Sequence, residues 1–488
     1  GGPMKQRIPL KGRQGEELLA AMSAFREGDA DWRSGRTWSL VYSAGEEHAA
    51  LLKQAYAMFF SENALNPMAF KSLKRMESEV VEMSASLLNG TPGVVGTMSS
   101  GGTESILLAC MAARERAGVR RPEMVAPKTI HVAFEKAAHY FGIKLRLAPV
   151  GRDKRADVRA MRKLINRNTV LVAASAPQYP HGVIDPIEEL AAIAHKRGIP
   201  FHTDACVGGF MLPWIERLGN PVPGWDFRVP GVTSISADIH KYGYASKGAS
   251  VVLYRDMSYL RHQFFVSTNW PGGIYASPSM AGTRPGGCIA AAWAAMNSLG
   301  EEGYLELARK ALEATRRLRA GIEAIPELEV LGDPPLTLLS YASVDPAVDI
   351  YAVADQLEAK GWSFDRHQSP AAIHATVNAN QLEHVDEYLE DIRRAVAEVK
   401  AHPELIGEGS APMYGMMARL PLRGLVRKSV LEVMEGLYGS KEGSLDLNDL
   451  GAGGKGGLMM QAARQYGGQV LGFMNRLDAR RRQGRSGL

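Results

Sequence analysis

Ser236-Ala237-Asp238-Ile239-His240-Lys241-Tyr242-Gly243-Tyr244 places a lysine directly after a histidine, at the end of an apolar strand. An amine held in a partly desolvated position has its charged form disfavoured, so we expect the pKa of Lys241 to fall. A neutral lysine amine attacks an aldehyde to form a Schiff base. Taken alone, a His-Lys pair more often marks a strand end that meets solvent, so the rest of the chain decides between the two interpretations.

A second short buried strand ends in a single carboxylate. It reads Ile199-Pro200-Phe201-His202-Thr203-Asp204-Ala205-Cys206. An isolated aspartate in this place is usually a cap of the following turn or helix. With Lys241 downstream, a carboxylate that pairs with a protonated pyridine nitrogen is the better interpretation. Pyridoxal 5′-phosphate (PLP) has both the aldehyde and the pyridine ring, and its protonated ring is an electron sink for carbanion chemistry.

A glycine-rich loop leads into a helical pattern upstream of both residues. The loop Gly96-Thr97-Met98-Ser99-Ser100-Gly101-Gly102-Thr103-Glu104-Ser105 runs directly into the apolar residues 106–111. Glycines let the backbone approach an anion closely, and free amides at a helix start bind a phosphate together with the hydroxyls of Ser100 and Thr103. An ordinary capped helix has a similar composition. The order of phosphate loop, acid and lysine favours a PLP site.

The chain resembles the sphingosine-1-phosphate lyases, within the broader PLP-dependent group that includes the amino-acid decarboxylases. The resemblance covers roughly residues 38–420. It implies an α/β chain of the PLP-dependent transferase-like fold, known as fold type I. The runs that carry it are Thr103-Glu104-Ser105-Ile106, Pro177-Gln178-Tyr179-Pro180-His181-Gly182-Val183-Ile184-Asp185-Pro186, Gly231-Val232-Thr233-Ser234-Ile235-Ser236-Ala237-Asp238 and Gly272-Gly273-Ile274-Tyr275-Ala276-Ser277-Pro278.

The resemblance assigns cofactor roles to individual residues. It implies that Lys241 holds PLP as a Schiff base, that Asp204 pairs with the pyridine nitrogen and that His131 stacks on the ring. From the residues alone, His131 is equally well a satisfied histidine at a strand end. Thr283 matches a position where relatives have serine and reach the cofactor phosphate of the neighbouring subunit, which implies a homodimer with shared active sites. The residues that match the phosphate-binding neighbourhood are Gly101, Gly102, Thr103 and His240.

Substrate recognition is implied in the same way. Tyr42, Asn63 and Lys247 match positions that line the entrance and hold the phosphate head group, although a solvated loop lysine is as good an interpretation of Lys247 alone. Tyr179 lies where a ring approaches the reacting hydroxyl. Relatives commonly have a histidine where this chain has Asn66. Asparagine donates a hydrogen bond but cannot become cationic, so the head-group preference follows less directly than the cofactor.

The implied reaction is a retro-aldol cleavage of a phosphorylated sphingoid base into a long-chain aldehyde and phosphoethanolamine. PLP delocalises negative charge from the amine-bearing carbon, and a lyase selects the bond to the hydroxyl-bearing carbon. The sequence leaves open whether the substrate phosphate, Tyr179, a histidine or Lys241 takes the hydroxyl proton. An amino-acid decarboxylase on the same scaffold is the second interpretation, and a non-catalytic binder of PLP or a lipid phosphate is the third.

Composition agrees with a large enzyme and excludes other classes. The 488 residues are 45% hydrophobic and suffice for a large core. The net charge of +5 is small, and without a nucleic-acid motif it does not favour nucleic-acid binding. The cysteines at 110, 206 and 288 provide neither a disulfide framework nor a metal site, so we expect a reducing cytoplasm.

The chain shows no membrane-spanning stretch and no signal-peptide pattern. Eukaryotic relatives typically carry an N-terminal anchor, so the resemblance implies a soluble, bacterial-type member. Gly1-Gly2-Pro3 before Met4 looks like an expression scar.

Alternating helical patterns and short apolar strands predict a mostly parallel sheet between helices, followed by a smaller α+β domain. Examples of these strands are residues 169–174 and 250–254, and a helical stretch is expected near 301–324. We expect helices over 45–90 that cover the active-site mouth and help form the dimer. The expected parts are an N-terminal helical segment over 4–90, a PLP-binding domain over 91–325, a small domain over 326–437, and a linker with a basic tail over 438–488.

The tail has two interpretations. The run 451–457 is a glycine-rich flexible linker, and the apolar residues beyond it precede Arg480-Arg481-Arg482. A subunit-packing or loosely ordered tail is favoured over an amphipathic helix that attaches to an anionic membrane surface, because Gly467 and Gly468 weaken such a helix.

Overall fold

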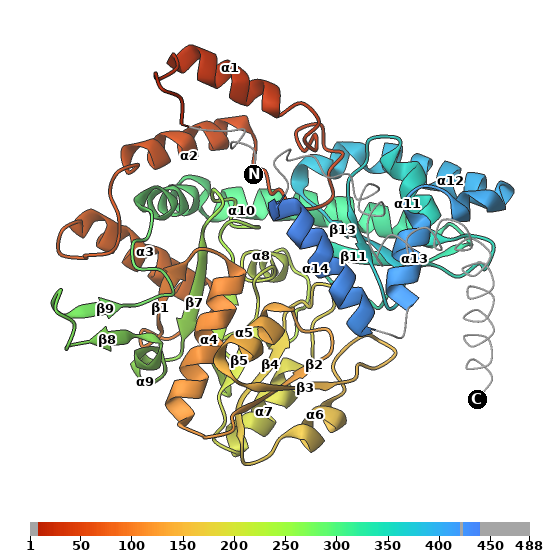
Figure 1. The fold of residues 1–488 in the computed structure, drawn as a ribbon. Coiled ribbons are helices and arrows are strands. Elements are labelled where there is room, and N and C mark those ends of the chain that lie inside the picture. Colours follow the sequence, from red (N-terminus) through yellow and green to blue (C-terminus); the bar gives the residue numbers. More distant parts are fainter. Residues whose placement is uncertain (1–7, 420–422, 440–488) are drawn as a thin grey trace.

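A seven-stranded sheet forms the centre of the larger part of the molecule (Figure 1). The computed structural model describes residues 8–419 and 423–439, so the predicted linker and basic tail beyond residue 439 lie outside the described residues. The strand order is β1-β7-β6-β5-β4-β2-β3. The strands are β1 (Val95–Ser99), β2 (Glu123–Pro127), β3 (Lys144–Ala148), β4 (Thr169–Ser175), β5 (Phe201–Asp204), β6 (Val232–Ala237) and β7 (Ser250–Tyr254).

The predicted parallel sheet is confirmed, with one exception. Neighbouring pairs among β3, β2, β4, β5 and β6 are all parallel. Strand β7 is antiparallel to both β6 and β1, so β1 runs in the same direction as β6. The carboxyl ends of every strand but β7 therefore lie at one edge of the sheet.

Both faces of the sheet are covered, which explains why β2, β4, β5, β6 and β7 are buried along their whole length. In β4, Leu171 and Ala173 join a core cluster with residues of α4 and α5. Val172 and Ala174 join a different cluster that includes residues of α7. The helices that follow these strands are α4 (Gly102–Ala117), α5 (Ala133–Phe141), α6 (Val158–Leu164), α7 (Ile187–Lys196), α8 (Leu212–Arg217) and α9 (Met257–Leu260), which continues into the 3-10 helix η1 (Arg261–Gln263).

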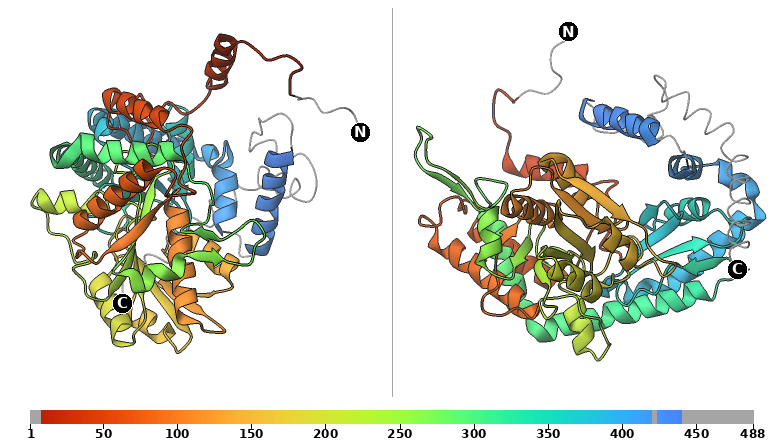
Figure 2. Two further views of the ribbon diagram at one scale, coloured as in Figure 1. Left: turned by 90° about the vertical axis from the view of Figure 1, so that its left-hand side faces the viewer. Right: turned by 90° about the horizontal axis from the view of Figure 1, so that it is seen from below.

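Three helices precede the sheet and one long helix follows it. Helices were expected over residues 45–90, and α2 (Glu46–Met58) and α3 (Lys71–Leu87) lie there. Helix α1 (Gly15–Phe25) buries none of its residues and stands clear of the body of the molecule in Figure 2. The hairpin of β8 (Phe265–Ser267) and β9 (Tyr275–Ser277) leads to α10 (Gly286–Glu323).

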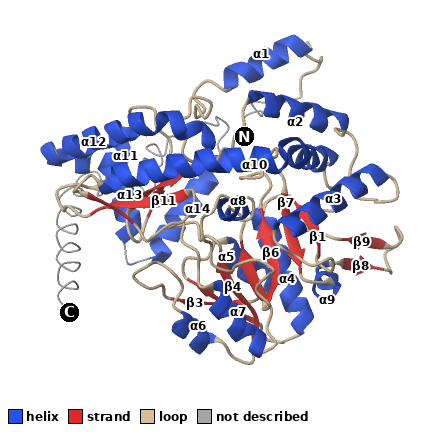
Figure 3. Cartoon of the chain, turned by 180° about the vertical axis from the view of Figure 1, so that it is seen from behind, coloured by secondary structure: helices blue, strands red, loops and turns tan. Residues whose placement is uncertain are grey.

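Helix α10 connects the two parts of the chain. It packs against α2, α3 and α8 at one end and against β10, β11 and α12 at the other (Figure 3). Gly300 has a left-handed φ of +57° and kinks the helix there. The predicted helical stretch near residues 301–324 is confirmed as the part of α10 beyond the kink, whereas the part from Gly286 to the kink was not predicted.

A four-stranded antiparallel sheet forms the smaller C-terminal part, in the order β10-β11-β13-β12. The predicted boundary after residue 325 falls between α10 and β10, and the division into domains stays a prediction. The elements are β10 (Leu328–Val330), β11 (Leu338–Ser343), α11 (Ile350–Glu358), β12 (Asp365–His367), β13 (Ala372–Thr376), η2 (Ala379–His384), α12 (Val385–Ala401), η3 (Pro403–Gly407), α13 (Ala411–Arg419) and α14 (Arg423–Gly439).

The N-terminal segment around Trp38 packs against this smaller part and forms hydrogen bonds with it. Trp38 is completely buried, and its ring stacks on Tyr388 with centroids 4.7 Å apart. Its backbone N–H donates to the carbonyl of Ser363 at 2.7 Å, and its carbonyl accepts from Thr376 at 2.8 Å. The segment between α1 and α2 is thereby tied to the second sheet. Of the helices in the described ranges, none has the length and apolarity needed to cross a membrane.

A buried ion pair fixes the loop before α10. Arg284 donates to both carboxylate oxygens of Glu77 on α3, and the two side chains are only 12% and 7% exposed. Glu77 also accepts from the backbone N–H of Met98 on β1 at 3.1 Å. The pair therefore joins α3, β1 and the loop that carries Thr283.

We predict that Glu77→Ala lowers the free energy of unfolding by about 3–5 kcal/mol, because it leaves the Arg284 charge buried without a partner. Thermal and denaturant unfolding measure this change. The matched control is Glu306→Ala, which removes a partner of Arg309 from an exposed pair and should leave the transition in place. Equal stability of the Glu77→Ala variant and the unmodified chain would show that the pair is not structural.

Candidate active site

The predicted catalytic residues lie along one edge of the large sheet. Asp204 ends β5, and Lys241 lies in the turn after β6. His131 follows β2, Tyr179 follows β4, and Gly101 follows β1. These strands run in the same direction, so their carboxyl ends share the edge where α/β sheets bind ligands. The fold thus brings together residues that are far apart in the sequence.

Lys241 forms an ion pair with Asp238 inside its own turn. The Nζ atom lies 3.0 Å from Oδ2 of Asp238, whose side chain is 1% exposed. Burial lowers the pKa of Lys241, but the charge and hydrogen bond of Asp238, together with Cys206 and Tyr42, raise it by more, and the net pKa lies above the usual value. The expected fall in pKa was therefore wrong. The sequence argument counted desolvation and overlooked a carboxylate three positions before the lysine.

Asp238 is a site residue that the sequence analysis did not single out. Its Oδ1 accepts from the Ser250 hydroxyl at 2.6 Å, and its backbone N–H donates to the carbonyl of Cys206 at 3.1 Å. A Cβ atom on Gly102 would lie 2.6 Å from Oδ2 of Asp238. The turn of Lys241 and the glycine-rich loop are therefore in direct contact, and only glycine fits at position 102.

The glycine-rich loop begins a helix, as predicted. Gly101 is the residue before α4, whose first residue is Gly102, so the free backbone amides of this helix start lie beside Asp238. Ser100 donates its backbone N–H to Glu104 at 3.0 Å. Thr103 lies in the first turn and its side chain is exposed. The helix start offers the amide groups that bind a phosphate.

His240 lies next to this loop and has a defined tautomer. Its Nδ1 accepts from the backbone N–H groups of Gly248 and Ala249, both at 3.1 Å, which assigns the proton to Nε2. A Cβ atom on Gly101 would lie 3.2 Å from the Cε1 atom of this ring. Burial lowers the pKa of His240 to about 4, so the ring is neutral at pH 7. It therefore presents an N–H donor beside the helix start without adding a charge.

Asp204 is buried and held through one of its two oxygens. Its Oδ1 accepts from the Cys206 N–H at 3.1 Å and from the Ser236 hydroxyl at 3.4 Å. Ser236 also contacts Nε2 of His202 at 2.9 Å, and burial lowers the pKa of His202 to about 4. A neutral histidine and a serine thus support the carboxylate from behind. Sequence reasoning quoted both residues but assigned them no role.

The turn around Lys241 is anchored from three directions. The Tyr242 hydroxyl donates to the carbonyl of Val377 at 2.7 Å, in the smaller part of the chain. The Tyr304 hydroxyl on α10 donates to the carbonyl of Gly243 at 2.8 Å. His48 on α2 contacts the carbonyl of Tyr244 at 2.8 Å, and Tyr244 itself has a positive φ of +54°. The smaller part of the chain, α10 and α2 therefore each fix the turn that carries the lysine.

Tyr42 and Lys247 lie together on the open side of this turn. The Tyr42 ring packs edge-on against Tyr242, with centroids 4.9 Å apart. The Nζ of Lys247 lies 5.1 Å from the centre of the Tyr42 ring and donates to the carbonyl of His240 at 3.2 Å. Burial raises the pKa of Tyr42 to about 12, so its hydroxyl stays protonated.

Tyr179 is held by the smaller sheet. Its hydroxyl donates to Oδ2 of Asp365 on β12 at 2.5 Å. His374 on β13 contacts the Tyr179 carbonyl through Nε2 at 2.9 Å and packs against its ring at 4.3 Å. Asp365 and His374 are missing from the predicted set, because nothing in the sequence near β12 and β13 resembles a catalytic motif. Only the folded chain brings them to Tyr179.

The remaining predicted residues are not joined to Lys241 by any contact among the described residues. The Nδ1 of His131 accepts from the Ala133 N–H at 3.0 Å, at the start of α5. Asn63 pairs with Pro285 in an isolated bridge and so lies beside the loop of Thr283, which is exposed. Asn66 accepts from the Met68 N–H at 2.9 Å in a local turn. Asn63 and Thr283 thus form a second group, near the start of α10.

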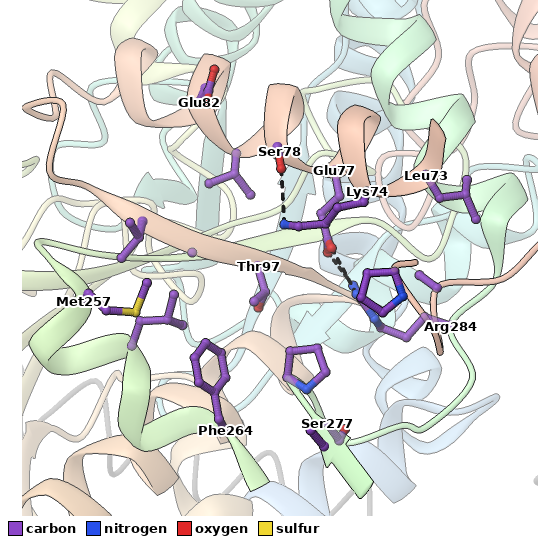
Figure 4. A pocket seen from close by; sticks show the side chains of 18 of the residues that line it. Leu73, Lys74, Glu77, Ser78, Glu82, Thr97, Met257, Phe264, Ser277 and Arg284 are labelled. Carbon is purple, nitrogen blue, oxygen red and sulfur yellow. Dashed lines mark hydrogen bonds and ion pairs between the residues drawn. The ribbon is translucent and has the colours of Figure 1, made fainter. Parts of the chain in front are cut away.

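A cavity of about 610 Å³ lies next to this second group (Figure 4). Its walls come from α3, β1, the β8–β9 hairpin and the loop of Arg284. The Arg284 and Glu77 pair and the contact of Lys74 with Ser78 at 3.2 Å are the polar interactions drawn at its wall. Lys241, Asp204 and His131 are not among the described lining residues, so the cavity is separate from the turn of Lys241.

The residues at the sheet edge fit PLP. A phosphate needs backbone amides without a nearby side chain, and the crowding at Gly102 keeps the start of α4 bare. A pyridine nitrogen needs a buried carboxylate, which Asp204 provides. The Lys241 amine pairs with Asp238, which lies beside Gly102 and donates its backbone N–H to the carbonyl of Cys206, and the Cys206 N–H donates to Asp204.

Comparison with known proteins agrees with this chemistry. Residues 31–343 match the family model described as the pyridoxal-dependent decarboxylase conserved domain. A sphingosine-1-phosphate lyase of Arabidopsis thaliana is 46% identical over 88% of this chain and 81% of the relative. A probable L-tyrosine/L-aspartate decarboxylase of Methanothermobacter thermautotrophicus is 37% identical over 70% of this chain and 93% of its own length.

A solved structure gives the same result. The sphingosine-1-phosphate lyase of Burkholderia pseudomallei superposes with a TM-score of 0.81 at 40% identity and covers 89% of this chain and 97% of that chain. PLP is the cofactor of this family. The chain belongs to the pyridoxal-dependent decarboxylase family and, within it, to the sphingosine-1-phosphate lyases.

Proposed function

We propose that this chain is a PLP-dependent aldehyde-lyase that cleaves phosphorylated sphingoid bases into a long-chain aldehyde and phosphoethanolamine. The observation that carries the proposal is the position of Lys247. Its ammonium group lies over the Tyr42 ring, and burial together with the nearby charge of Lys241 lowers its pKa. A cation beside the reactive lysine suits a substrate that has an amine and a phosphate close together.

Each residue of the sheet edge has a role in this reaction. The start of α4 at Gly101 and Gly102, with the N–H of His240, binds the cofactor phosphate, and Asp204 pairs with the pyridine nitrogen. His131 would lie against the cofactor ring, Thr103 would supply a further hydroxyl, and Thr283 would supply one from the partner protomer. Bound PLP withdraws electrons from the amine-bearing carbon of the substrate. Lys241 would be the residue that holds the cofactor.

The substrate phosphate is bound at the entrance. Lys247 provides a charge and Tyr42 a neutral hydrogen-bond group, and Asn63, which lies beside Thr283, would provide a second neutral group from the other protomer of a dimer. Asn66 stands where relatives commonly have histidine, and it keeps a donor but cannot become cationic. Lys247 therefore carries a larger share of the phosphate affinity in this chain than a lysine that is assisted by a protonated histidine.

We also propose a homodimer in which Thr283 of one protomer completes the site of its partner. The support is that Asn63 and Thr283 lie beside each other, and the described contacts do not join them to Lys241 of the same chain. The β8–β9 hairpin near this group exposes large apolar side chains, among them Val266 at 59% and Ile274 at 80%. A cytoplasmic location and peripheral membrane contact through the tail stay predictions.

The first prediction concerns the products. Purified, PLP-loaded protein given sphinganine 1-phosphate should release a long-chain aldehyde and phosphoethanolamine in equal amounts, detected by mass spectrometry. Lys241→Ala should abolish turnover, since no amine remains to hold the cofactor and exchange it. Carbon dioxide release from an amino acid, with sphinganine 1-phosphate left intact, would identify a decarboxylase instead. Cofactor binding without turnover of either substrate would identify a binding protein.

The second prediction concerns pH. Burial and the Lys241 charge lower the pKa of Lys247 to about 8. Lys247 is therefore charged below pH 8 and loses its charge as the pH rises above 8. One lost charged hydrogen bond weakens binding by about tenfold, so KM for the phosphorylated substrate should rise by about tenfold between pH 7 and roughly pH 9.5. Lys247→Arg is the control, because arginine stays charged and should flatten this rise. The same rise in Lys247→Arg would exclude Lys247 as its cause.

The third prediction tests the shared site. Lys241→Ala and Thr283→Asp should each be inactive, because the second change places a negative charge beside the cofactor phosphate. In a mixed dimer one of the two sites contains neither change, so refolded or co-expressed mixtures should recover activity. Sedimentation of the unmodified protein should give twice the chain mass of 53.0 kDa. Mixtures that stay inactive while mixed dimers form would show that each protomer has an independent site.

A further inference from the structure

Tyr179 is held at three points by the smaller sheet. The ring packs against His374 and His367, at 4.3 Å and 5.2 Å between centroids. Its carbonyl accepts from His374 at 2.9 Å, and its hydroxyl donates to Asp365 at 2.5 Å. Burial lowers the pKa of both histidines, so these rings are neutral supports. These contacts fix the phenol ring in one position, and its hydroxyl donates a hydrogen bond to a carboxylate.

The register of the smaller sheet explains this arrangement. Asp365 on β12 is directly opposite His374 on β13, so the two side chains emerge side by side. The next residue, Arg366, points to the other face, where it pairs with Asp355 and Glu358 at 2.8 Å. Within residues 8–419 and 423–439, no lysine or arginine forms an ion pair with Asp365. Asp365 is therefore available as an acceptor for the tyrosine hydroxyl.

Asp365 also faces the rest of the site. Its charge acts on Tyr42 as well as on Tyr179, and Tyr42 in turn interacts with Lys241. Burial and the charge of Asp365 raise the pKa of Tyr179 far above its usual value. A phenol in this position does not become a free phenolate at pH 7. It accepts a proton only if it gives up its own at the same time.

We propose that Asp365 is the final acceptor of the substrate hydroxyl proton, which reaches it through Tyr179. This inference rests on the proposed lyase function. As the carbon–carbon bond breaks, the substrate O–H bond breaks and its proton bonds to the phenolic oxygen of Tyr179. The Tyr179 O–H bond breaks, and that proton bonds to Oδ2 of Asp365, which becomes a neutral carboxylic acid.

The electrons balance over this step. The electron pair of the substrate O–H bond becomes the second bond of the aldehyde C=O group. The pair of the broken carbon–carbon bond stays on the amine-bearing carbon, where the cofactor stabilises it. When the aldehyde has left, Asp365 gives its proton to water, and the carboxylate is restored. Tyr179 is neutral before and after the step, which agrees with its burial.

The test compares Asp365→Asn with Tyr179→Phe in the PLP-loaded full chain. An asparagine oxygen still accepts the Tyr179 hydrogen bond and keeps the ring in place, but the amide does not take up the proton. General acid–base groups contribute about 10²–10⁴-fold, so kcat for aldehyde formation should fall by about 10² or more in both variants. KM and the visible absorbance of bound PLP should stay the same. The double variant should be no slower than the slower single variant, because both changes break one route.

Asp391→Asn is the matched control. Asp391 also accepts a single side-chain hydrogen bond in the smaller part, from Trp362 Nε1 at 2.8 Å, but it does not contact Tyr179. It should keep full kcat. An Asp365→Asn variant with unchanged kcat, or a double variant with additive losses, would overturn the relay.

Two further results keep the outcomes distinct. If the Asp365→Asn variant does not bind PLP or does not unfold cooperatively, Asp365→Glu is measured as a second variant. A higher kcat for the glutamate than for the asparagine variant supports the relay, and an equal kcat overturns it. If the unmodified chain forms no aldehyde from sphinganine 1-phosphate, the proposed function itself fails. If the unmodified chain forms aldehyde and Asp365→Asn has the same kcat, the relay is overturned and the proposed function stands.

Discussion

The site depends on keeping a charged lysine inside the protein. Lys241 is partly buried, with 26% of its side chain exposed, and it pairs with the buried Asp238, whose charge together with other nearby groups outweighs the desolvation that otherwise drives the amine to its neutral form. Such a pair is stable only where geometry and further hydrogen bonds are exact. Ser250, the backbone of Cys206 and the bare Gly102 all serve this requirement. The glycine-rich loop, β6 and β7 are arranged around one ion pair.

The same turn also joins the two sheets. Tyr242 follows the lysine directly, and its hydroxyl donates to the carbonyl of Val377. Tyr179, which follows β4 of the large sheet, donates its hydroxyl to Asp365 on β12 of the smaller sheet. In each connection, a phenol hydroxyl of the large part donates a hydrogen bond to a polar group of the smaller part. Small displacements between the two sheets would therefore move the reactive groups relative to each other. The smaller sheet therefore fixes the positions of two phenols at the edge of the larger one.

Sequence reasoning located the elements whose signals are local. The strand ending at Asp204, the loop before α4 and the lysine after β6 are short, contiguous patterns, and each lies at the sheet edge. The predicted fall in the pKa of Lys241 was wrong because burial was considered without the charge of Asp238, although Asp238 lies in the same stretch of sequence. Asp365 and His374 were out of reach, since their role arises from strand pairing and not from a motif. The half of α10 before the kink at Gly300 was likewise not predicted from the sequence.

The position of Asp365 has a consequence for how the enzyme comes into being. A chain still emerging from the ribosome completes β1 to β7, with Lys241 and Asp204, long before β12 is made. At that stage Tyr179 has no carboxylate for its hydroxyl, and Tyr242 has no carbonyl from Val377. The residues that fit the cofactor are therefore synthesised before the proposed proton acceptor. The smaller sheet is the last part of the site to be made, and with it come the two groups that fix the phenols of Tyr179 and Tyr242.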